Sequence, residues 1–417
     1  MPDKSSLLNM ARLSAASGLV VVALAGCGSS TPASPPSSTS VPKNVTLTLW
    51  SWQGGAQLTK VRQLAQQWAK LHGDTVKVVD QSKNANGFQF YATAARTGKG
   101  PDVVFGMPHD NNGVFAEEGL LAKVPKGAIN PNDYTKSVLD AIKVNGVEYS
   151  LPVSVQAIAL FYNKAMIKSP PKTWSQFSSD ATRYGFGYDQ ANLYDNYILI
   201  GGMGGYVFKN NNGTLDPNDI GLDNPGAIEA FGLMRDMVAK YHWMEPTTTG
   251  AIALQQFITK KIGMYISGAW DINNVKAANI PYGIAMLPTL PNGHAMTPFL
   301  GVITTLVNSR SSQQVADWSL AEFLSNRQAQ LDYFDVSQQV PAMTSLQHSS
   351  VITKNPLFRA FAAETPHAVP MPNIPQMQAV WSAMSVIQNI IEGKVSPAMG
   401  AKDFVKNIKK GIQVQSS

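Results

Sequence analysis

Apolar and polar residues alternate along residues 45–50, Val-Thr-Leu-Thr-Leu-Trp, which is typical of a β-strand with one buried face. Across residues 57–71 the apolar positions recur every three or four residues, which predicts a helix that packs on a sheet. Further strands are predicted at 76–79 and 102–105, with a helical segment ending at Arg96 between them. This order of strands and helices predicts an α/β fold containing parallel strands.

The second half of the chain continues the same mixture. The pattern predicts strands at 157–162 and 263–267, and helices at 225–241, 313–331, 376–391 and 401–412. No Pro/Gly-rich linker divides the roughly 370 residues after the N-terminal region, although that length is more than one comfortable core holds. Two α/β lobes that the chain crosses more than once would satisfy both observations.

The first 26 residues are predicted to be a secretory signal peptide. Lys4 and Arg12 precede an uncharged, largely apolar run at 13–26, which is too short to span a bilayer comfortably. The run ends in Leu-Ala-Gly before Cys27, the only cysteine of the chain. This stretch resembles a bacterial lipobox, and the resemblance implies a diacylglyceryl thioether on Cys27 that anchors the protein at the extracellular face of the cell membrane.

The residues that follow Cys27 are rich in Ser, Thr and Pro up to residue 43. Such a composition buries no apolar area and favours an extended, flexible tether. It also leaves Cys27 nothing to pack against, which disfavours the alternative that Cys27 is an ordinary buried thiol. The folded body is therefore expected to begin near Asn44, and no later run of about 18 apolar residues predicts a membrane span.

Composition excludes several classes of function. Charged residues make up 14% of the chain, and the net charge of +6 includes no long basic run, which disfavours nucleic acid as a partner. The chain has no P-loop, dinucleotide fingerprint, G-x-S-x-G or H-E-x-x-H motif, so we expect no cofactor, no metal and no catalysis. Because a pair of glycosidase carboxylates needs no sequence motif, a surface glycan-active enzyme stays an alternative.

Two tryptophans do not fit the core pattern. Trp68 and Trp318 belong to apolar helical stripes and are predicted to be buried. Trp381 instead shares its helical face with Ser385, and Trp270 follows a predicted strand end, where open α/β folds bind ligands. A large aromatic side chain on a polar surface can bind a flat apolar group, so both are candidate ligand contacts.

Six short motifs occur along the chain: GPDVVF at 100–105, YNK at 162–164, PPKTW at 170–174, GGYVF at 204–208, PFLGV at 298–302 and MPNIPQM at 371–377. In this order they resemble the motifs of the maltose-binding proteins of ABC importers, within bacterial extracellular solute-binding protein family 1. The chain resembles this family from about residue 45 to residue 412. The resemblance implies a periplasmic-binding-protein type II-like fold, in which hinge segments join two α/β lobes around a sugar cleft. It also implies capture of maltose and maltodextrins and their delivery to the membrane permease subunits of an ABC importer.

The resemblance implies a division of the chain as well. The expected parts are a signal peptide at 1–26, lipidated Cys27 and tether at 27–43, lobe 1 at 44–154 and 305–350, and lobe 2 at 159–299 and 357–411. Hinge segments are expected at 155–158, 300–304 and 351–356.

The family's sugar contacts can be carried over to matching positions. Trp270, Trp381 and Tyr194 match aromatic residues that stack on the C–H face of a sugar ring. The remaining candidates are Asp110, which matches a carboxylate, its neighbour His109, the apolar contact Met371, and Gln53, Gln156 and Asn192, which stand where the family has charged residues.

These departures replace charges with neutral amides. A carboxamide still offers an acceptor and two donors, so affinity for a neutral sugar can survive while the preferred sugar length becomes open. Another oligosaccharide, a polyol or a peptide is therefore an alternative ligand.

The scarcity of charge suggests a second hypothesis, that the protein works at an acidic exterior. A carboxylate whose folded pKa is depressed by a partner loses its contribution to stability on acidification, and fewer such groups reduce that loss. Compositional drift is the alternative explanation.

Overall fold

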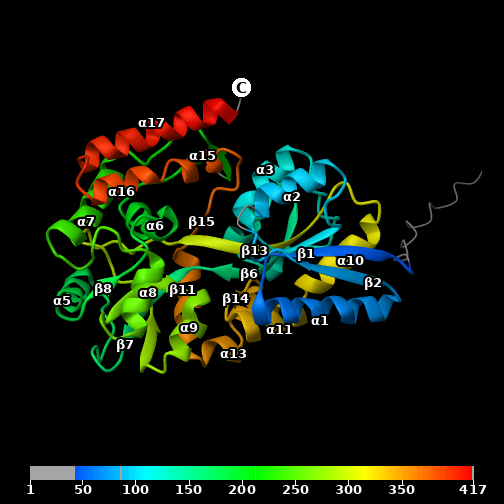
Figure 1. Ribbon diagram of the computed structural model, residues 1–417, viewed down its shortest axis with the longest axis horizontal. Helices are drawn as coiled ribbons and strands as arrows, with labels where there is room; N and C mark the ends of the chain where they lie inside the picture. Colours follow the sequence, from blue (N-terminus) through cyan, green and yellow to red (C-terminus); the bar gives the residue numbers. More distant parts are fainter. Residues whose placement is uncertain (1–42, 85–86, 212, 416–417) are drawn as a thin grey trace, which may run out of the picture. The chain divides into compact units, whose positions relative to one another are not determined.

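The computed structural model describes residues 43–84, 87–211 and 213–415 (Figure 1). The predicted signal peptide, Cys27 and nearly all of the predicted tether lie outside the described residues. Within the described part, no helix has both the length and the apolar character needed to cross a membrane.

One mixed sheet combines strands from the N-terminal part of the chain with later ones, in the order β14-β6-β13-β3-β1-β2, with β15 pairing beside β13. Its strands are β1 (Thr46–Ser51), β2 (Thr75–Asp80), β3 (Val103–Pro108), β6 (Ser150–Gln156), β13 (Phe299–Val307), β14 (Val340–Pro341) and β15 (Val369–Pro370). β1 pairs in parallel with β2 and β3, as the sequence pattern predicts. β13 runs antiparallel to β3 and β6, so the sheet is not purely parallel.

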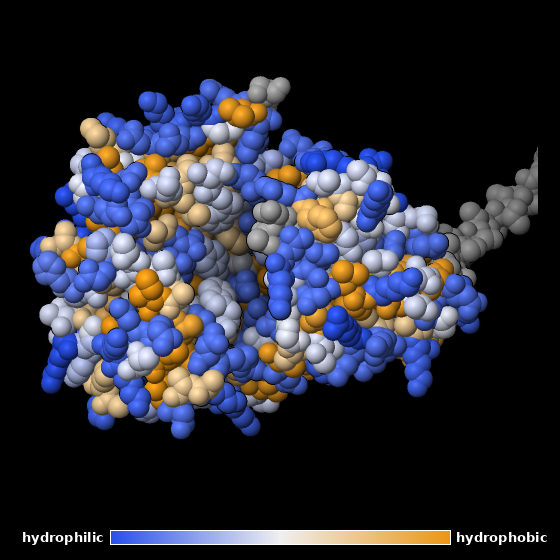
Figure 2. All heavy atoms as spheres, in the orientation of Figure 1, coloured by the Kyte–Doolittle hydropathy of each residue, from blue (hydrophilic) through white to orange (hydrophobic). Residues whose placement is uncertain are grey.

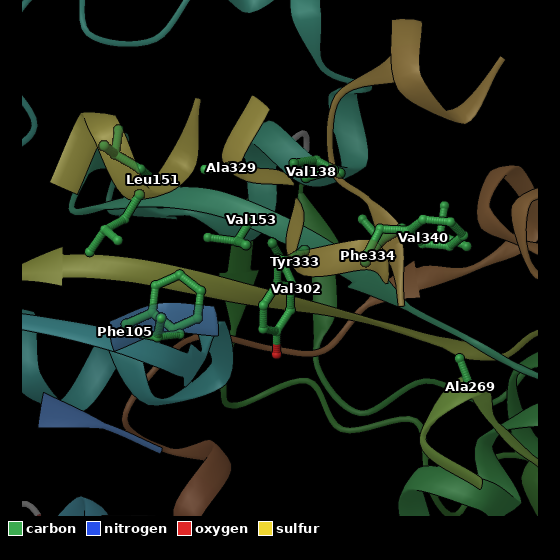
Figure 3. Close-up of a cluster of buried hydrophobic side chains, with 14 of the residues drawn as sticks. Phe105, Val138, Leu151, Val153, Ala269, Val302, Ala329, Tyr333, Phe334 and Val340 are labelled. Carbon is green, nitrogen blue, oxygen red and sulfur yellow. The ribbon is translucent and has the colours of Figure 1, made fainter. Parts of the chain in front are cut away.

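Helices cover this sheet because each has one apolar stripe. α1 (Gly55–His72), α10 (Gln314–Ser325) and α11 (Arg327–Ser337) pack on one face, and α2 (Gly87–Arg96) and α3 (Asn112–Glu117) contribute to a separate apolar cluster with β1 and β3. Figure 3 shows part of the larger cluster, where Phe105 and Tyr333 pack edge to face at 5.3 Å between ring centroids.

A second mixed sheet has the order β12-β7-β11-β8. Its strands are β7 (Ile158–Asn163), β8 (Phe186–Gly187), β11 (Met264–Gly268) and β12 (Tyr282–Ala285). The helices α5 (Trp174–Tyr184), α6 (Leu193–Gly202), α7 (Pro225–Ala239), α15 (Met377–Ser382), α16 (Ser385–Ile391) and α17 (Pro397–Gln415) share one apolar cluster with it. The helices α8 (Gly250–Ile258), α9 (Ile272–Ala277) and α14 (Pro356–Glu364) join the other cluster.

The chain passes directly from one sheet to the other at Ala157, between β6 and β7. The two sheets with their helices form the two lobes of the fold (Figure 1). The lobe boundaries and hinge segments that the resemblance implies stay a prediction.

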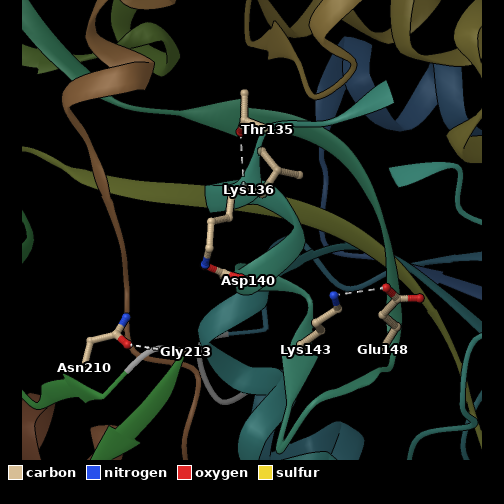
Figure 4. A network of polar contacts seen from close by, with 8 residues as sticks. Thr135, Lys136, Asp140, Lys143, Glu148, Asn210 and Gly213 are labelled. Atoms are coloured by element: carbon tan, nitrogen blue, oxygen red, sulfur yellow. Dashed lines mark hydrogen bonds and ion pairs between the residues drawn. The ribbon is translucent and has the colours of Figure 1, made fainter. Parts of the chain in front are cut away.

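Small elements are fixed by local polar contacts. At the start of α4 (Lys136–Ala141), the Thr135 hydroxyl accepts a hydrogen bond from the Val138 N–H, and Lys136 pairs with Asp140 (Figure 4). A 3.5 Å ion pair between Lys143 and Glu148 joins β4 (Lys143–Val144) to β5 (Val147–Glu148). The other short elements are η2 (Pro131–Asp133), β9 (Lys209–Asn211), β10 (Thr214–Asp216), α12 (Thr344–Gln347), α13 (Ser350–Thr353) and η4 (Thr365–His367).

Two helices that were each predicted as one element are divided in the structure, so these predictions are wrong. The helix expected at 313–331 is split into α10 and α11, because the Asn326 side chain accepts a hydrogen bond from the Ala329 N–H and starts a new helix. The helix expected at 376–391 is broken around Ala383 into α15 and α16.

Candidate functional site

An aromatic pair stands at the C-terminal end of β11. Trp270 lies in the short helix η3 (Ala269–Asp271), directly after that strand, and is 39% exposed. Tyr194 lies in the first turn of α6, where the Asn192 side chain accepts a hydrogen bond from the Tyr194 N–H at 3.0 Å. The two ring centroids are 6.0 Å apart at an interplanar angle of 56°. Together they offer the kind of apolar surface on which the C–H face of a sugar can pack.

Gln156 and Tyr194 meet at a glycine of β13. Gly301 pairs with Gln156 in the sheet register, and a Cβ on Gly301 would lie 3.2 Å from Gln156 Oε1 and 3.6 Å from Tyr194 Oη. The glycine therefore leaves room for both polar groups. Tyr194 Oη is buried without a hydrogen-bond partner among the described residues.

Asp110 connects this region to Trp381. Asp110 lies in η1 (His109–Asn111), just after β3, and accepts a hydrogen bond from the Trp381 side chain. Burial raises the pKa of Asp110 to about 6, although hydrogen bonds from its own backbone and from Trp381 oppose the shift. Burial also raises the pKa of Tyr194, with smaller contributions from Asp195 and Asp110, which places the Asp110 charge near the phenol.

His109 is fully buried, and both of its ring nitrogens are bonded to backbone. Nδ1 accepts from the Val302 N–H at 3.0 Å, so Nε2 carries the proton and donates to the Met371 carbonyl at 3.1 Å. Burial lowers the pKa of His109 to about 4, which keeps the ring neutral near pH 7. The geometry gives His109 a positioning role between β13 and the segment after β15, rather than the direct sugar contact expected from the sequence.

Gln53 and Met371 also make their contacts within the protein. The Gln53 amide donates to the Gly106 carbonyl at 3.1 Å and accepts from the Tyr333 hydroxyl at 2.8 Å. Met371 packs in an apolar cluster, with its backbone held by Leu300 and His109. Of the residues expected at the site, Trp270, Trp381, Tyr194, Gln156, Asn192 and Asp110 are thus the ones whose arrangement suits ligand contact.

Two hollows adjoin these residues. A pocket of about 380 Å³ is lined by residues that include Asn192, Tyr194, Asp195, Gly250, Trp270 and Asp271. A groove of about 420 Å³ runs between α2, α3 and α15, and its lining includes Phe88, Gln89, Arg96, Glu118, Gln378 and Ser382. Figure 2 shows the surface recessed between the part that holds α1 and α2 and the part that holds α7 and α8.

The sequence did not reveal Phe88, which lines the groove between α2, α3 and α15, or Trp52, which stacks on Phe88. Trp52 follows β1 and stacks on Phe88 at 6.1 Å between centroids. Because β1 and β3 are parallel neighbours, Trp52 and Asp110 follow strand ends at the same edge of the sheet. That shared edge is the signal by which Trp52 could have been found. No cluster of three or more metal-ligating side chains occurs in the described part of the chain.

Comparison with known proteins gives consistent matches over the body of the chain. Residues 63–360 match the model of a family described as bacterial extracellular solute-binding protein. A galactooligosaccharide-binding protein of Bacillus subtilis (strain 168) is 30% identical, over 95% of this chain and 96% of its own length. A maltooligosaccharide ABC transporter solute-binding lipoprotein of Streptococcus pneumoniae (strain ATCC BAA-334 / TIGR4) is 28% identical, over 98% of each chain.

A solved structure is more similar still. The maltose-maltodextrin binding protein of the thermoacidophilic bacterium Alicyclobacillus acidocaldarius is 63% identical, with a TM-score of 0.84. The match covers 87% of this chain and 100% of that one. The two-lobed α/β fold and the family match agree, and this chain belongs to the bacterial extracellular solute-binding proteins.

Proposed function

We propose that this protein binds maltose and maltodextrins outside the cell and delivers them to an ABC importer without changing them chemically. The observation that carries the proposal is a set of neighbouring side chains: Trp381 interacts with Asp110, Gln156 and Tyr194 both approach Gly301, and Tyr194 pairs with Trp270. The 63% identity to a maltose-maltodextrin binding protein supports the same ligand class.

The side chains suit a neutral sugar because they combine apolar faces with hydrogen-bonding groups. Indole and phenol rings pack on the C–H face of a pyranose, while Asp110, Gln156 and Tyr194 Oη bond its rim hydroxyls. These groups come from both sheets and their helices. A sugar that contacts all of them therefore stabilises a closed arrangement of the two lobes over an open one.

We also propose that lipid on Cys27 anchors the protein at the extracellular face of the membrane. The lipobox-like order of residues 24–27 supports this, and the pneumococcal relative is named a lipoprotein. Mass spectrometry of protein extracted from membranes would test it. A chain that begins at residue 27 and carries acyl groups is expected, and an unprocessed N-terminus would contradict the proposal.

The second candidate is a binding protein for a different oligosaccharide. A relative named for galactooligosaccharide binding, at 30% identity over nearly the whole chain, favours it. The neutral side chains at Gln156 and Asn192 allow such a change, because they alter which sugar hydroxyls are recognised.

Tryptophan fluorescence titration would separate these candidates, because Trp270 is partly exposed at the proposed site. Saturable changes with maltose and maltotriose, and none with galactooligosaccharide or glucose, would support the proposal. The opposite pattern would favour the second candidate. Chromatography of maltotetraose after long incubation should show no product, and a product that depends on the protein would indicate an enzyme.

A further inference from the structure

The last helix of the body, α17, carries a stripe of lysines on its outer side. Its inner side packs on α7, α15 and α16, and the side chains buried there are Ala401, Phe404, Val405 and Ile408. The lysine stripe consists of the exposed residues Lys402, Lys406, Lys409 and Lys410. At 3.6 residues per turn these four positions fall within about 100° of the helix circumference, on the side away from the buried residues. Figure 1 shows α17 along one edge of the body.

Acidic groups do not balance the lysine stripe. Asp403 is the one acidic residue of α17, so four positive charges stand against one negative charge, and the helix supplies half of the chain's net charge of +6. Among the described residues, no ion pair includes a lysine of the stripe. On the neighbouring α7, Asp236 pairs with Lys240 instead, at 3.7 Å. Glu392, which follows α16, pairs with Lys394.

The stability of the helix does not explain the lysine stripe. Lys402 and Lys406 are four residues apart, as are Lys406 and Lys410, and like charges at this spacing destabilise a helix. Cations interact favourably with the helix dipole in the last turn, and α17 has no basic residue in its last turn. The arrangement therefore weakens the helix unless a negatively charged partner faces it.

The chemistry of the stripe fits an anionic lipid surface. All four cations are lysines, whose flexible side chains act as point charges, whereas arginine is favoured where a phosphate or carboxylate is held in a fixed geometry. Met399 lies seven residues before Lys406, on the same side of the helix, and is 59% exposed. A basic helix face that includes an exposed apolar side chain is typical of binding at a bilayer interface.

We propose that the lysine stripe of α17 binds the anionic headgroups of the bilayer that carries the protein. The inference goes beyond sugar binding and rests on the proposed lipid anchor. A lipid on Cys27 would keep the body close to one bilayer and so raise the effective concentration of headgroups. Each lysine adds a weak, salt-sensitive attraction, and four together hold one side of the body on the surface.

Energy transfer from α17 to the bilayer tests the proposal. Cys27 is the only cysteine of the chain, so a dye on Gln413→Cys, an exposed position on the same helix, labels one site of the lipidated protein. The acceptor is a headgroup-labelled lipid in vesicles of phosphatidylcholine, alone or mixed with an equal amount of phosphatidylglycerol. Transfer on the mixed vesicles should be about twofold higher than on phosphatidylcholine alone, and this difference should disappear at high salt.

Two sets of substitutions separate the stripe from net charge. The first combines Lys402→Gln, Lys406→Gln, Lys409→Gln and Lys410→Gln, and it should remove the difference between the two kinds of vesicle. The matched control combines four substitutions at exposed lysines elsewhere, Lys123→Gln, Lys126→Gln, Lys164→Gln and Lys168→Gln. It lowers the net charge equally and should keep the difference. Both proteins should keep the maltose affinity of the wild type, and neither should melt below it.

Equal transfer on the two kinds of vesicle, or a difference that survives the loss of the stripe, would overturn the inference. Loss of the difference in the control as well would show that net charge is responsible, and would overturn it too. Wild-type protein that does not float with phosphatidylcholine vesicles lacks the lipid, which would overturn the proposed anchor instead. The comparison of the two variants on mixed vesicles then still decides the inference.

Discussion

Trp270 and Trp381 are held differently, although both are proposed to stack on sugar. Trp381 donates a hydrogen bond to buried Asp110, while Trp270 packs beside Tyr194 and keeps 39% of its surface exposed. Trp270→Ala should therefore weaken maltose binding by about 2 kcal/mol, because the ring that stacks on the sugar is lost. The stability of the fold should change little, because no buried polar group loses a hydrogen-bond partner. Calorimetry and thermal melting of the variant measure the two effects.

Trp381→Ala should weaken maltose binding and also destabilise the fold. Because Asp110 loses a hydrogen-bond donor, the free energy of unfolding should fall by about 1–3 kcal/mol. Trp381→Phe is the matched control, because it removes the donor but keeps a ring that can stack. Normal maltose affinity in both alanine variants would remove these tryptophans from the site.

Glu364 shows how a single buried carboxyl group makes stability depend on pH. It is 2% exposed, accepts a hydrogen bond from the Leu287 N–H, and has its pKa raised to about 7 by burial. Because the folded pKa exceeds the unfolded value of about 4.5, this group destabilises the fold above pH 7 and less so as pH falls. Glu364→Gln should therefore melt at a higher temperature than the wild type at pH 8, and at the same temperature near pH 4.5.

The matched control for this variant is Glu117→Gln, at an exposed position. It should not change the melting temperature at either pH. A pH-independent effect of Glu364→Gln would show that burial of its charge is not the cause.

Among the elements, β13 is the central strand of the first sheet to which the most other segments are bonded. It pairs with β3 and β6 on one side of the fold and with β15 at its start, and His109 bonds it to the segment that carries Met371. His109→Ala should lower the free energy of unfolding by about 3 kcal/mol, because it leaves the buried Val302 N–H and Met371 carbonyl without partners.

Urea denaturation measures this loss, and His294→Ala at an exposed loop position is the control expected to change nothing. A His109→Ala protein as stable as the wild type would show that water replaces the ring without cost.

Amphipathic elements were predictable from the sequence, whereas fully buried ones were not. The three-to-four-residue spacing in α1 and the alternation in β1 follow from burial of one face only. All nine residues of β13 are buried, so its pattern carries no alternation and it was expected only as a hinge segment at 300–304. The break between α10 and α11 depends on one cap, Asn326, which apolar spacing does not reveal.

At the scale of the whole molecule, the apolar pattern singled out Trp270 and Trp381, and the resemblance added Tyr194 and Asp110 to the proposed site. It did not predict Asp195 or Phe88, because the sequence does not show which side chains line a hollow between helices. It also assigned His109 and Gln53 to sugar contact, where the structure uses their polar atoms for internal hydrogen bonds.

Taken together, the pKa shifts of the buried carboxyl groups favour stability of the fold at acidic pH. Burial raises the pKa of Asp110 and Asp317 to about 6 and that of Glu364 to about 7, so each destabilises the fold less as pH falls toward about 4. His109 acts in the opposite sense between about pH 6.5 and 4, because its folded pKa is about 4. The ion pairs between described residues are all partly exposed, and losing them costs little.

The melting temperature at pH 5 is therefore expected to equal or exceed that at pH 7.5. Calorimetric scans at the two values measure it. Melting at pH 5 well below the value at pH 7.5 would refute the hypothesis that the protein is built for an acidic exterior.

The central claim is that the recess between the two lobes binds α-1,4-linked glucose chains. Isothermal titration with maltose and maltotriose, beside glucose and a galactooligosaccharide, tests it most directly. Binding of both maltose and maltotriose at micromolar or lower dissociation constants, with no heat from glucose, is the predicted result. No binding of maltose or maltotriose, together with saturable binding of the galactooligosaccharide, would contradict the account.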